Sequence, residues 1–255
     1  MMFLSYPPAP LPPPVRPHLA ETRALAARAL PALALAALLG AAGSAGAAPA
    51  AATKKAKPAT EDAAEHGRAT PPPNSSPLAE LRKSNDTLKK VLGKQSPSWS
   101  PEQDAKRSEV RKVVGQFLDF EELSRRSLAR HWDKLTPRQR TEFVDTLREL
   151  VERNYIKQIH GQPDYELRFD KETKEGSEAS VTAALNTRTA KGKKVTVDLE
   201  YKLLYKNGHW VVYDVITDEQ SLLENYRAEF NKIIEKDGFE ALLKRMRKKL
   251  NEKTD

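Results

Sequence analysis

The segment from Asp164 to Thr217 alternates apolar and polar residues with a period of two, and this pattern constrains the fold more than any other feature of the chain. We predict four strands in it, near Tyr165–Asp170, Glu178–Arg188, Val195–Tyr205 and His209–Ile216. The third is the clearest, because every second residue is apolar and the others are polar, which gives one apolar face. The short connections favour an antiparallel meander, in which Asn207-Gly208 supplies the positive φ angles of a tight hairpin.

Helical periodicity governs the segments before and after these strands. Several of the helices begin at capping residues, whose short polar side chains can accept a hydrogen bond from an unpaired backbone N–H of the first turn. Six helices are predicted, opening at Ser76-Pro77, Ser100-Pro101, Asp119, Thr136-Pro137 and Ser221, with the last one following Gly238. The order of helices, strands and helices predicts an α+β fold with an antiparallel sheet of about four strands, whose apolar face is covered by helices.

The first 76 residues differ in composition from the rest of the chain. Residues 29–39 are strongly apolar but too few to span a bilayer, and they precede the small-residue motif Ala45-Gly46-Ala47. We therefore predict a cleavable signal peptide over residues 1–47 and export by the general secretory route. Residues 48–76 contain hardly any large apolar side chain, so we expect a disordered linker there and a folded domain over residues 77–253.

Residue composition removes several classes of function. The chain has no cysteine, which excludes a disulfide scaffold, a thiolate metal site, a cysteine nucleophile and an acylated lipoprotein cysteine. Beyond the linker, His131, His160 and His209 have no partner at metal-ligand spacing, so no metal site is expected. The sequence also has no Gly-x-Ser-x-Gly, Walker or Gly-x-Gly-x-x-Gly motif. These absences disfavour triad and nucleotide chemistry.

The net charge of +8 and the basic residues between Lys244 and Lys249 are compatible with an anionic lipid or a nucleic acid. An exported protein meets little nucleic acid. No aromatic residues interleave with these basic side chains, as a stacking platform for bases would require. We therefore expect no nucleic-acid partner, and a solvated helix face explains the basic run equally well.

One polar constellation leaves a catalytic alternative open. With a two-residue loop at Asn207-Gly208, Tyr201 would lie opposite Asp214, and the carboxylate would point into the apolar face. With a three-residue loop containing a bulge, Tyr213 would take that place and Asp214 would face solvent. A buried aspartate beside a tyrosine would resemble the acid–base sites of curved-sheet isomerases and would have a raised pKa. An aspartate in a strand more often accepts a structural hydrogen bond.

Two groups of residues carry a resemblance to a known family. The first group is Phe120-Glu121-Glu122-Leu123, Trp132, Leu135-Thr136-Pro137, Gln139, Phe143 and Leu150 to Tyr155. The second, more specific group is Gly208-His209-Trp210, Val212-Tyr213-Asp214-Val215, Ser221-Leu222, Asn225-Tyr226-Arg227 and Phe230. In order and spacing they resemble the MlaC or toluene-tolerance family of periplasmic phospholipid-binding proteins, over about Pro101 to Leu250. Against the family pattern, Asp218-Glu219-Gln220 stands where a glycine usually precedes the Ser-Leu pair.

The resemblance implies a periplasmic carrier of glycerophospholipid that needs no cofactor, catalyses no reaction and holds its cargo in an apolar cavity between a curved sheet and helices. Its implied partners are an outer-membrane lipoprotein complex and an inner-membrane ABC transporter that bears an MCE-domain subunit, and we expect a monomer. On this reading, Arg227 is a candidate contact for the lipid phosphate, or else part of a cap or ion pair.

The lipid would be lined by apolar residues of the predicted sheet and helices. A closed core would use the same residue types, so each lining assignment is a hypothesis. The expected lining residues are Val195, Val197, Leu199, Tyr201, Leu203, Val211, Tyr213 and Val215 from the sheet, and Phe143, Leu147, Leu150, Leu222, Tyr226 and Phe230 from the helices.

Overall fold

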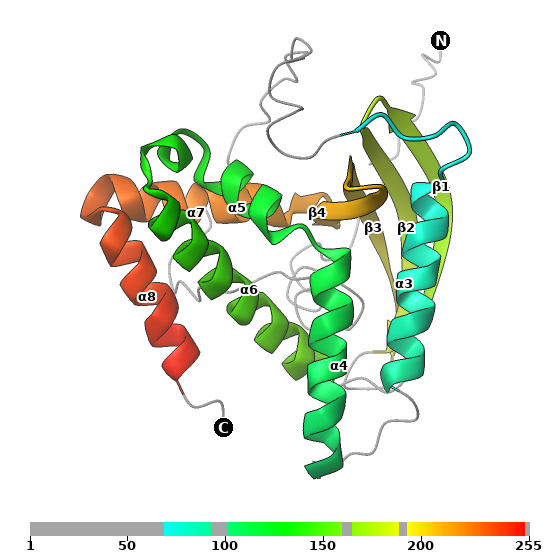
Figure 1. Ribbon diagram of the computed structural model, residues 1–255. Helices are drawn as coiled ribbons and strands as arrows, with labels where there is room; N and C mark the ends of the chain where they lie inside the picture. The colour runs from blue at the N-terminus through cyan, green and yellow to red at the C-terminus, as the bar shows by residue number, and fades with distance from the viewer. Residues whose placement is uncertain (1–68, 93–100, 160–164, 189–192, 253–255) are drawn as a thin grey trace, which may run out of the picture.

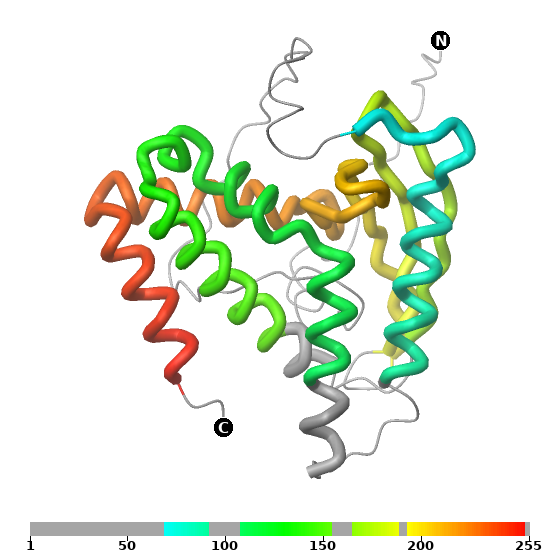
Figure 2. Tube along the Cα trace, in the orientation of Figure 1, coloured from blue at the N-terminus to red at the C-terminus, as the bar shows by residue number. Residues whose placement is uncertain are grey.

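The computed structural model describes residues 69–92, 101–159, 165–188 and 193–252, so the predicted signal peptide, most of the predicted linker and Ser100 lie outside the described part. Within it, the chain begins with helices α3 (Pro77–Leu92), α4 (Pro101–Phe117), α5 (Phe120–Leu128), η1 (Ala129–Lys134) and α6 (Pro137–Ile159). The strands follow as β1 (Glu166–Glu175), β2 (Glu178–Arg188), β3 (Lys194–Lys206), β4 (His209–Thr217) and β5 (Gln220–Ser221). Helices α7 (Leu222–Asp237) and α8 (Phe239–Asn251) end the described chain, which Figures 1 and 2 trace from end to end.

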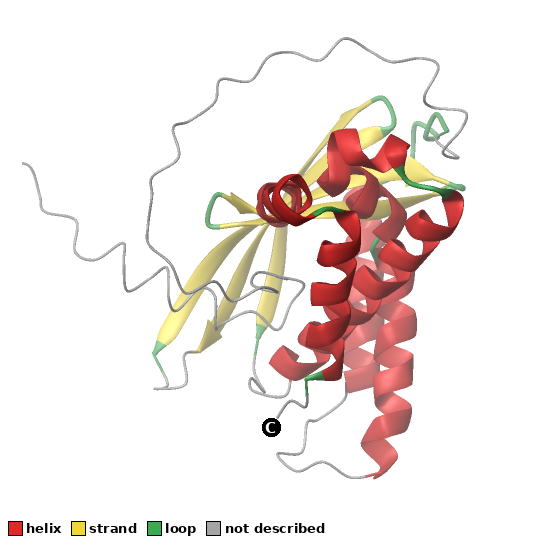
Figure 3. Cartoon of the chain, turned by 90° about the vertical axis from the view of Figure 1, so that its left-hand side faces the viewer, coloured by secondary structure: helices red, strands yellow, loops and turns green. Residues whose placement is uncertain are grey.

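The strands form one sheet in the order β1-β2-β3-β4-β5, and every neighbouring pair is antiparallel. Figure 3 shows this sheet lying beside the group of helices. The predicted α+β class and antiparallel meander are therefore confirmed. The two-residue strand β5 was not predicted. Among the described residues, no helix is both long enough and apolar enough to cross a membrane.

Capping hydrogen bonds confirm the predicted helix starts at Asp119, Thr136 and Ser221. Asp119 and Ser221 each accept a hydrogen bond from the backbone N–H three residues later, at 2.9 and 3.0 Å. Thr136 and Gln139 exchange side-chain and backbone hydrogen bonds in a reciprocal capping box. Gly238 has a φ of +83°, a conformation that costs glycine little, and it separates α7 from α8.

One face of the sheet packs against α3 and α4, and we call it the α4 face. On β3 it carries the alternating residues that the sequence predicts, and the ring of Tyr201 lies 6.2 Å from the rings of Phe117 in α4 and Phe169 in β1. The N-terminal end of α3 is held to the same face, since Glu172 of β1 accepts hydrogen bonds from Ser76 Oγ and Leu78 N at 2.7 and 2.9 Å. The two elements are thereby joined through a carboxylate.

The opposite face of the sheet is covered by α5 near the β3–β4 hairpin, and we call it the α5 face. It carries Lys202, Leu204 and Lys206 of β3, and Lys206 forms ion pairs with Asp119 and Glu121 at 3.0 and 2.9 Å. Helix α5 follows directly from α4, and the junction is fixed to the edge of β4 by a hydrogen bond from Asp119 N to Val212 O at 2.8 Å.

A bulge in β4 decides which side chains reach which face. The hairpin loop has the two residues Asn207-Gly208, and Lys206 pairs with His209 across it. Further along, Leu203 pairs with Val212, but its neighbour Lys202 pairs with Asp214, so Tyr213 is the extra residue. Neither predicted register is therefore correct. The loop is the two-residue one, and the bulge lies within the strand.

Because of the bulge, two residues that were predicted to line the lipid site lie on the other face of the sheet. Val211 pairs with Leu204 and Tyr213 lies against α5, so both side chains belong to the α5 face and not to the α4 face. In their place, Trp210 and Val212 lie on the α4 face opposite Tyr205 and Leu203. Because residues 210–213 are all apolar, the sequence contains no polar residue that would mark the change of side.

A second packing region lies among the C-terminal helices. The ring of Phe143 in α6 contacts Phe230 of α7 and Phe239 of α8, with centroids 5.5 and 6.0 Å apart. Tyr226 stacks on Phe230, one turn away on the same helix, at 5.1 Å. These aromatic contacts hold α6, α7 and α8 together beside the sheet (Figure 1).

Candidate functional site

The α4 face of the sheet is mainly apolar. Glu172 and Lys174 are its only charged residues in the described part of the sheet, and both hold the segment that leads into α3. The rest of the face is made mainly of buried aliphatic and aromatic side chains, with small ones on β2, and it also carries the buried threonines Thr187 and Thr217. The face includes Leu167, Phe169, Ala179, Val181, Ala183, Leu185, Val197, Leu199, Tyr201, Leu203, Val212 and Val215.

Two tyrosine hydroxyls on this face have no hydrogen-bond partner. Tyr201 is completely buried, and its hydroxyl oxygen contacts no donor or acceptor at hydrogen-bond distance. Tyr165, directly before β1, also has a buried hydroxyl without a partner, while Lys89 of α3 lies 5.6 Å from its ring centroid. An unsatisfied buried polar group costs roughly 1–3 kcal/mol of stability. These two groups therefore point to something polar that the described residues do not provide.

Burial keeps both hydroxyls protonated. It raises the pKa of Tyr165 to about 12 and raises the pKa of Tyr201 still further, and the nearby Tyr165 adds to the second effect. A phenol with such a pKa is neutral throughout the physiological range. Each hydroxyl can therefore donate one hydrogen bond to a ligand in an apolar environment.

The other predicted lining residues are almost all buried, but they fall into separate groups. Val195 is the one exception, since it is only half-buried at the end of β3. The six helical residues, Phe143, Leu147, Leu150, Leu222, Tyr226 and Phe230, are buried in α6 and α7, where the aromatic ones contact each other. The hydroxyl of Tyr226 is a third buried group without a partner, and burial raises its pKa.

Asp214 does not share a pocket with Tyr201. The bulge places Asp214 beside Lys202 on the α5 face, where the carboxylate accepts hydrogen bonds from Ser221 Oγ at 2.7 Å and Leu223 N at 2.9 Å. Asp214 is also buried, which contradicts the prediction that it would face solvent in a bulged hairpin. The carboxylate anchors the N-terminus of α7, as an aspartate commonly does in a structural role. The predicted acid–base pair is therefore not formed.

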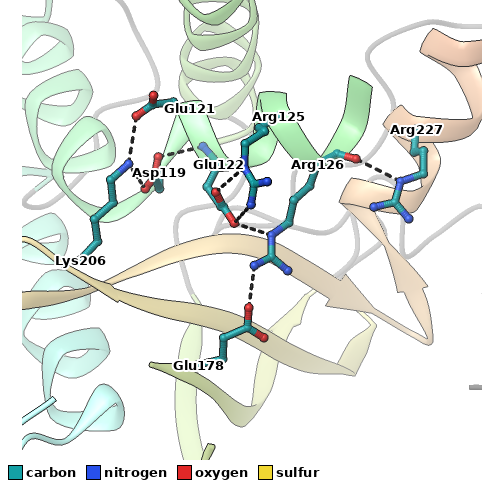
Figure 4. Close-up of polar contacts among 8 residues, drawn as sticks. All are labelled: Asp119, Glu121, Glu122, Arg125, Arg126, Glu178, Lys206 and Arg227. Atoms are coloured by element: carbon teal, nitrogen blue, oxygen red, sulfur yellow. Dashed lines mark hydrogen bonds and ion pairs between the residues drawn. The ribbon is translucent and has the colours of Figure 1, made fainter. Parts of the chain in front are cut away.

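An ionic cluster lies between α5 and the sheet (Figure 4). The buried carboxylate of Glu122 binds Arg125 at 2.9 Å and Arg126 at 2.6 Å, and Arg126 reaches Glu178 of β2 at 2.6 Å. Burial alone would raise the pKa of Glu122, but the two guanidinium groups outweigh it and lower the pKa to about 2. Sequence analysis did not identify this cluster as a unit.

Arg227 takes part at the margin of this cluster. Its Nε donates to the backbone oxygen of Arg126 at 3.0 Å, and its guanidinium binds Glu224 at 2.6 Å. These contacts match the predicted cap or ion pair, and they occupy the group that was also a candidate for a lipid phosphate. In the described part of the chain, no three acidic or histidine side chains are grouped so that they could hold a metal ion.

The family model described as "MlaC protein" matches residues 82–248. The chain belongs to the MlaC family. The matched residues include the whole sheet and most of α3 and α8, so the α4 face and the ionic cluster both lie inside the family domain.

Two known proteins are similar to this MlaC chain. It is 23% identical over 141 residues to the "Intermembrane phospholipid transport system binding protein MlaC" of Haemophilus influenzae, a match that spans 55% of this chain and 66% of that protein. Its fold is similar to that of a phospholipid-binding protein from Ralstonia solanacearum solved in complex with a phospholipid. The TM-score is 0.57 at 20% identity, and the match covers 69% of this chain and 97% of the other.

Proposed function

We propose that this MlaC chain binds one glycerophospholipid, with its acyl chains against the α4 face and under α3 and α4, and carries it between two membranes. The observation that supports this most directly is the α4 face itself, which is mainly apolar, nearly uncharged and provided with two tyrosine hydroxyls that have no partner in the described part of the chain. The helical residues Phe143, Leu147, Leu150, Leu222, Tyr226 and Phe230 are proposed to close the compartment at the side of α6 and α7.

Such a carrier has to shield the acyl chains from water in an apolar compartment while it moves between the membranes. Each CH₂ group transferred from water into an apolar environment contributes about 0.8 kcal/mol, so two acyl chains cannot cross an aqueous space uncovered. A protein compartment replaces the bilayer interior at similar free energy. Loading and release are then nearly balanced exchanges, and the direction of transport has to come from the partners. No reactive group is needed for this task, which agrees with the structural role of Asp214.

The location and partners are part of the proposal. The predicted signal peptide supports a periplasmic location. The name of the Haemophilus influenzae relative, which refers to an intermembrane phospholipid transport system, supports exchange with membrane complexes. We propose an inner-membrane ABC transporter with an MCE-domain subunit and an outer-membrane lipoprotein complex as those partners.

The proposal is tested by the lipid content of the purified protein. The chain is produced with residues 1–47 so that it can be exported, and it is purified without detergent from the periplasmic fraction. Organic extraction and mass spectrometry should recover close to one phospholipid per chain. Protein that carries no phospholipid after purification, and takes none up from phospholipid vesicles, would refute the proposed function.

A further inference from the structure

The hydroxyl of Tyr201 is a fully buried group without a hydrogen-bond partner among the described residues. The residue is 0% exposed, and its ring is held from two sides by Phe117 and Phe169. These contacts keep the ring on the α4 face. The hydroxyl therefore stays in the interior, where it faces the surface that we assign to the acyl chains.

The surroundings of Tyr201 restrict what can satisfy it. Val181 and Val215 are its partners on the neighbouring strands, and neither offers a polar side chain. The nearest carboxylate along β4, Asp214, lies on the other face and accepts two other hydrogen bonds. Tyr165 is close enough for its charge state to affect Tyr201, and its hydroxyl has no partner either. Among the described residues of the α4 face, therefore, neither of these two hydroxyls has a hydrogen-bond partner.

The chemistry of the missing acceptor follows from this environment. A carboxylate or phosphate oxygen carries a charge, and an unpaired charge is very costly in an apolar interior. An ester carbonyl is neutral, accepts hydrogen bonds well and lies at the start of each acyl chain of a diacyl lipid. A diacyl glycerophospholipid supplies two such carbonyls, which equals the number of unpaired tyrosine hydroxyls on the α4 face.

We propose that Tyr201 and Tyr165 donate hydrogen bonds to the ester carbonyl oxygens of the bound lipid, and that the carrier therefore prefers ester-linked to ether-linked phospholipids. This inference rests on the proposed function. It adds a specificity, because an ether-linked lipid of the same length fills the same apolar space but offers the hydroxyls only ether oxygens, which are weaker acceptors than ester carbonyls. A site that recognises a polar group loses much of its affinity for an analogue that lacks that group.

The test compares two lipids in one exchange assay. Delipidated protein is incubated with vesicles of diacyl phosphatidylethanolamine and phosphatidylglycerol, or with their dialkyl analogues of equal chain length, and the lipid taken up per chain is measured. The wild-type chain should bind the diacyl lipid more tightly by at least about two- to tenfold, which is the range expected for each net hydrogen bond. Tyr201→Phe should lower this ratio toward one by weakening diacyl binding alone, while Tyr165 keeps part of the preference.

A second readout separates this role from a merely structural one. Tyr201→Phe removes a buried hydroxyl that has no partner, so the delipidated variant should melt at the same temperature as the wild type or higher. The matched control is Tyr205→Phe on the same strand, whose hydroxyl already donates to Gly208 O at 3.1 Å. This control should melt lower and keep the wild-type preference. Tyr165→Phe provides an independent variant and should also lower the ratio.

The lipid-uptake results distinguish a failure of the ester preference from a failure of the proposed function. Equal uptake of both lipids by the wild type would overturn the inference and leave the proposed function intact. A Tyr201→Phe variant that keeps the wild-type ratio would also overturn it, and would mean that water satisfies the hydroxyl. Uptake of neither lipid would refute the proposed function and the inference with it.

Discussion

The guanidinium group of Arg126 lies over the ring of Tyr213, with Cζ 3.9 Å from the ring centroid. Tyr213 is the bulge residue of β4, so this contact joins α5 to the point where the strand changes its pairing. The same guanidinium also binds Glu122 on its own helix and Glu178 on β2, both at 2.6 Å. One side chain therefore connects α5 to two strands of the sheet, and Figure 4 shows its ion pairs with Glu122 and Glu178.

Replacing Arg126 should destabilise the fold strongly. Arg126→Met leaves the carboxylate of Glu122 buried with one guanidinium partner in place of two, and breaking a buried ion pair costs about 3–5 kcal/mol. Urea unfolding followed by circular dichroism measures this loss. The double variant Glu122→Gln/Arg126→Met removes both charges and should recover part of the stability. A single variant as stable as the wild type would show that the cluster contributes little.

Stability should also depend on pH through Glu122. Its pKa is about 2 in the folded chain against an ordinary value of 4.5, so the ionised form is stabilised by folding. A lowered pKa gives a contribution that is complete above about pH 4.5 and is lost as the pH falls toward 2. The size of this contribution is on the order of 3 kcal/mol.

The measurement is urea unfolding at several pH values between 2 and 6. Glu122→Gln cannot titrate at this position, so the difference in stability between wild type and variant should shrink as the pH falls through this range. Glu149→Gln removes an exposed carboxylate on α6 and serves as the control, which should follow the wild type. A constant difference between wild type and Glu122→Gln would contradict the lowered pKa.

Most of the fold could be predicted because helix caps and tight turns require particular residue types, which are visible in the sequence. The capping residues Asp119, Thr136 and Ser221 begin helices where the sequence places them, since a short polar side chain satisfies backbone N–H groups that nothing else reaches. The hairpin at Asn207-Gly208 is also correct, because both residues adopt positive φ. These signals depend on neighbouring residues alone.

Two features of the sheet were missed, the second half of β1 and the short strand β5. Strand β1 continues past Asp170 to Glu175, although its second half is charged, because Glu172 and Lys174 bind the segment that leads into α3. Strand β5 follows a turn in which Asp218 and Glu219 adopt φ of 45° and 67°, values that usually call for glycine or asparagine. The partners of Glu172 and Lys174 are about 100 residues away in the sequence, and the turn before β5 lacks the residue types that usually mark it.

The apolar face of the candidate site was predicted correctly on β3 but not on β4. On β3 the alternation fixed the α4 face correctly, because polar residues separate Val197, Leu199 and Tyr201. On β4 the run of apolar residues concealed the bulge, so Val211 was assigned to the wrong face. The absence of a partner for the Tyr201 hydroxyl could not be predicted, since it follows from the full three-dimensional surroundings.

Replacing Asp214 should affect stability and not lipid content. Asp214→Ala removes the acceptor for Ser221 Oγ and Leu223 N, and the loss of such a cap costs about 1–2 kcal/mol. Asp214→Asn keeps one acceptor oxygen and should lose less. Phospholipid recovered by extraction should equal the wild-type amount in both variants. An enzymatic turnover found in the wild type and abolished by Asp214→Asn would instead support the isomerase-like alternative.

Enlarging side chains on the two faces of β3 should distinguish a lipid compartment from a closed core. Val197 and Leu199 lie on the α4 face, so a tryptophan at either position would occupy volume that we assign to acyl chains. We expect Val197→Trp and Leu199→Trp to fold, to melt cooperatively and to lose most of the bound phospholipid. Extraction and mass spectrometry measure the lipid, and thermal unfolding measures the fold.

Leu204 provides the matched control on the same strand. It is completely buried on the α5 face, where no lipid is proposed, so Leu204→Trp should strain a close-packed region and cost about 1–3 kcal/mol. Any folded Leu204→Trp protein should keep its phospholipid. The α4-face variants should thus lose lipid but remain stable, whereas Leu204→Trp should lose stability but retain lipid. If Val197→Trp and Leu199→Trp instead unfold, while their folded fraction keeps a full lipid complement, the α4 face is an ordinary core and the lipid binds elsewhere.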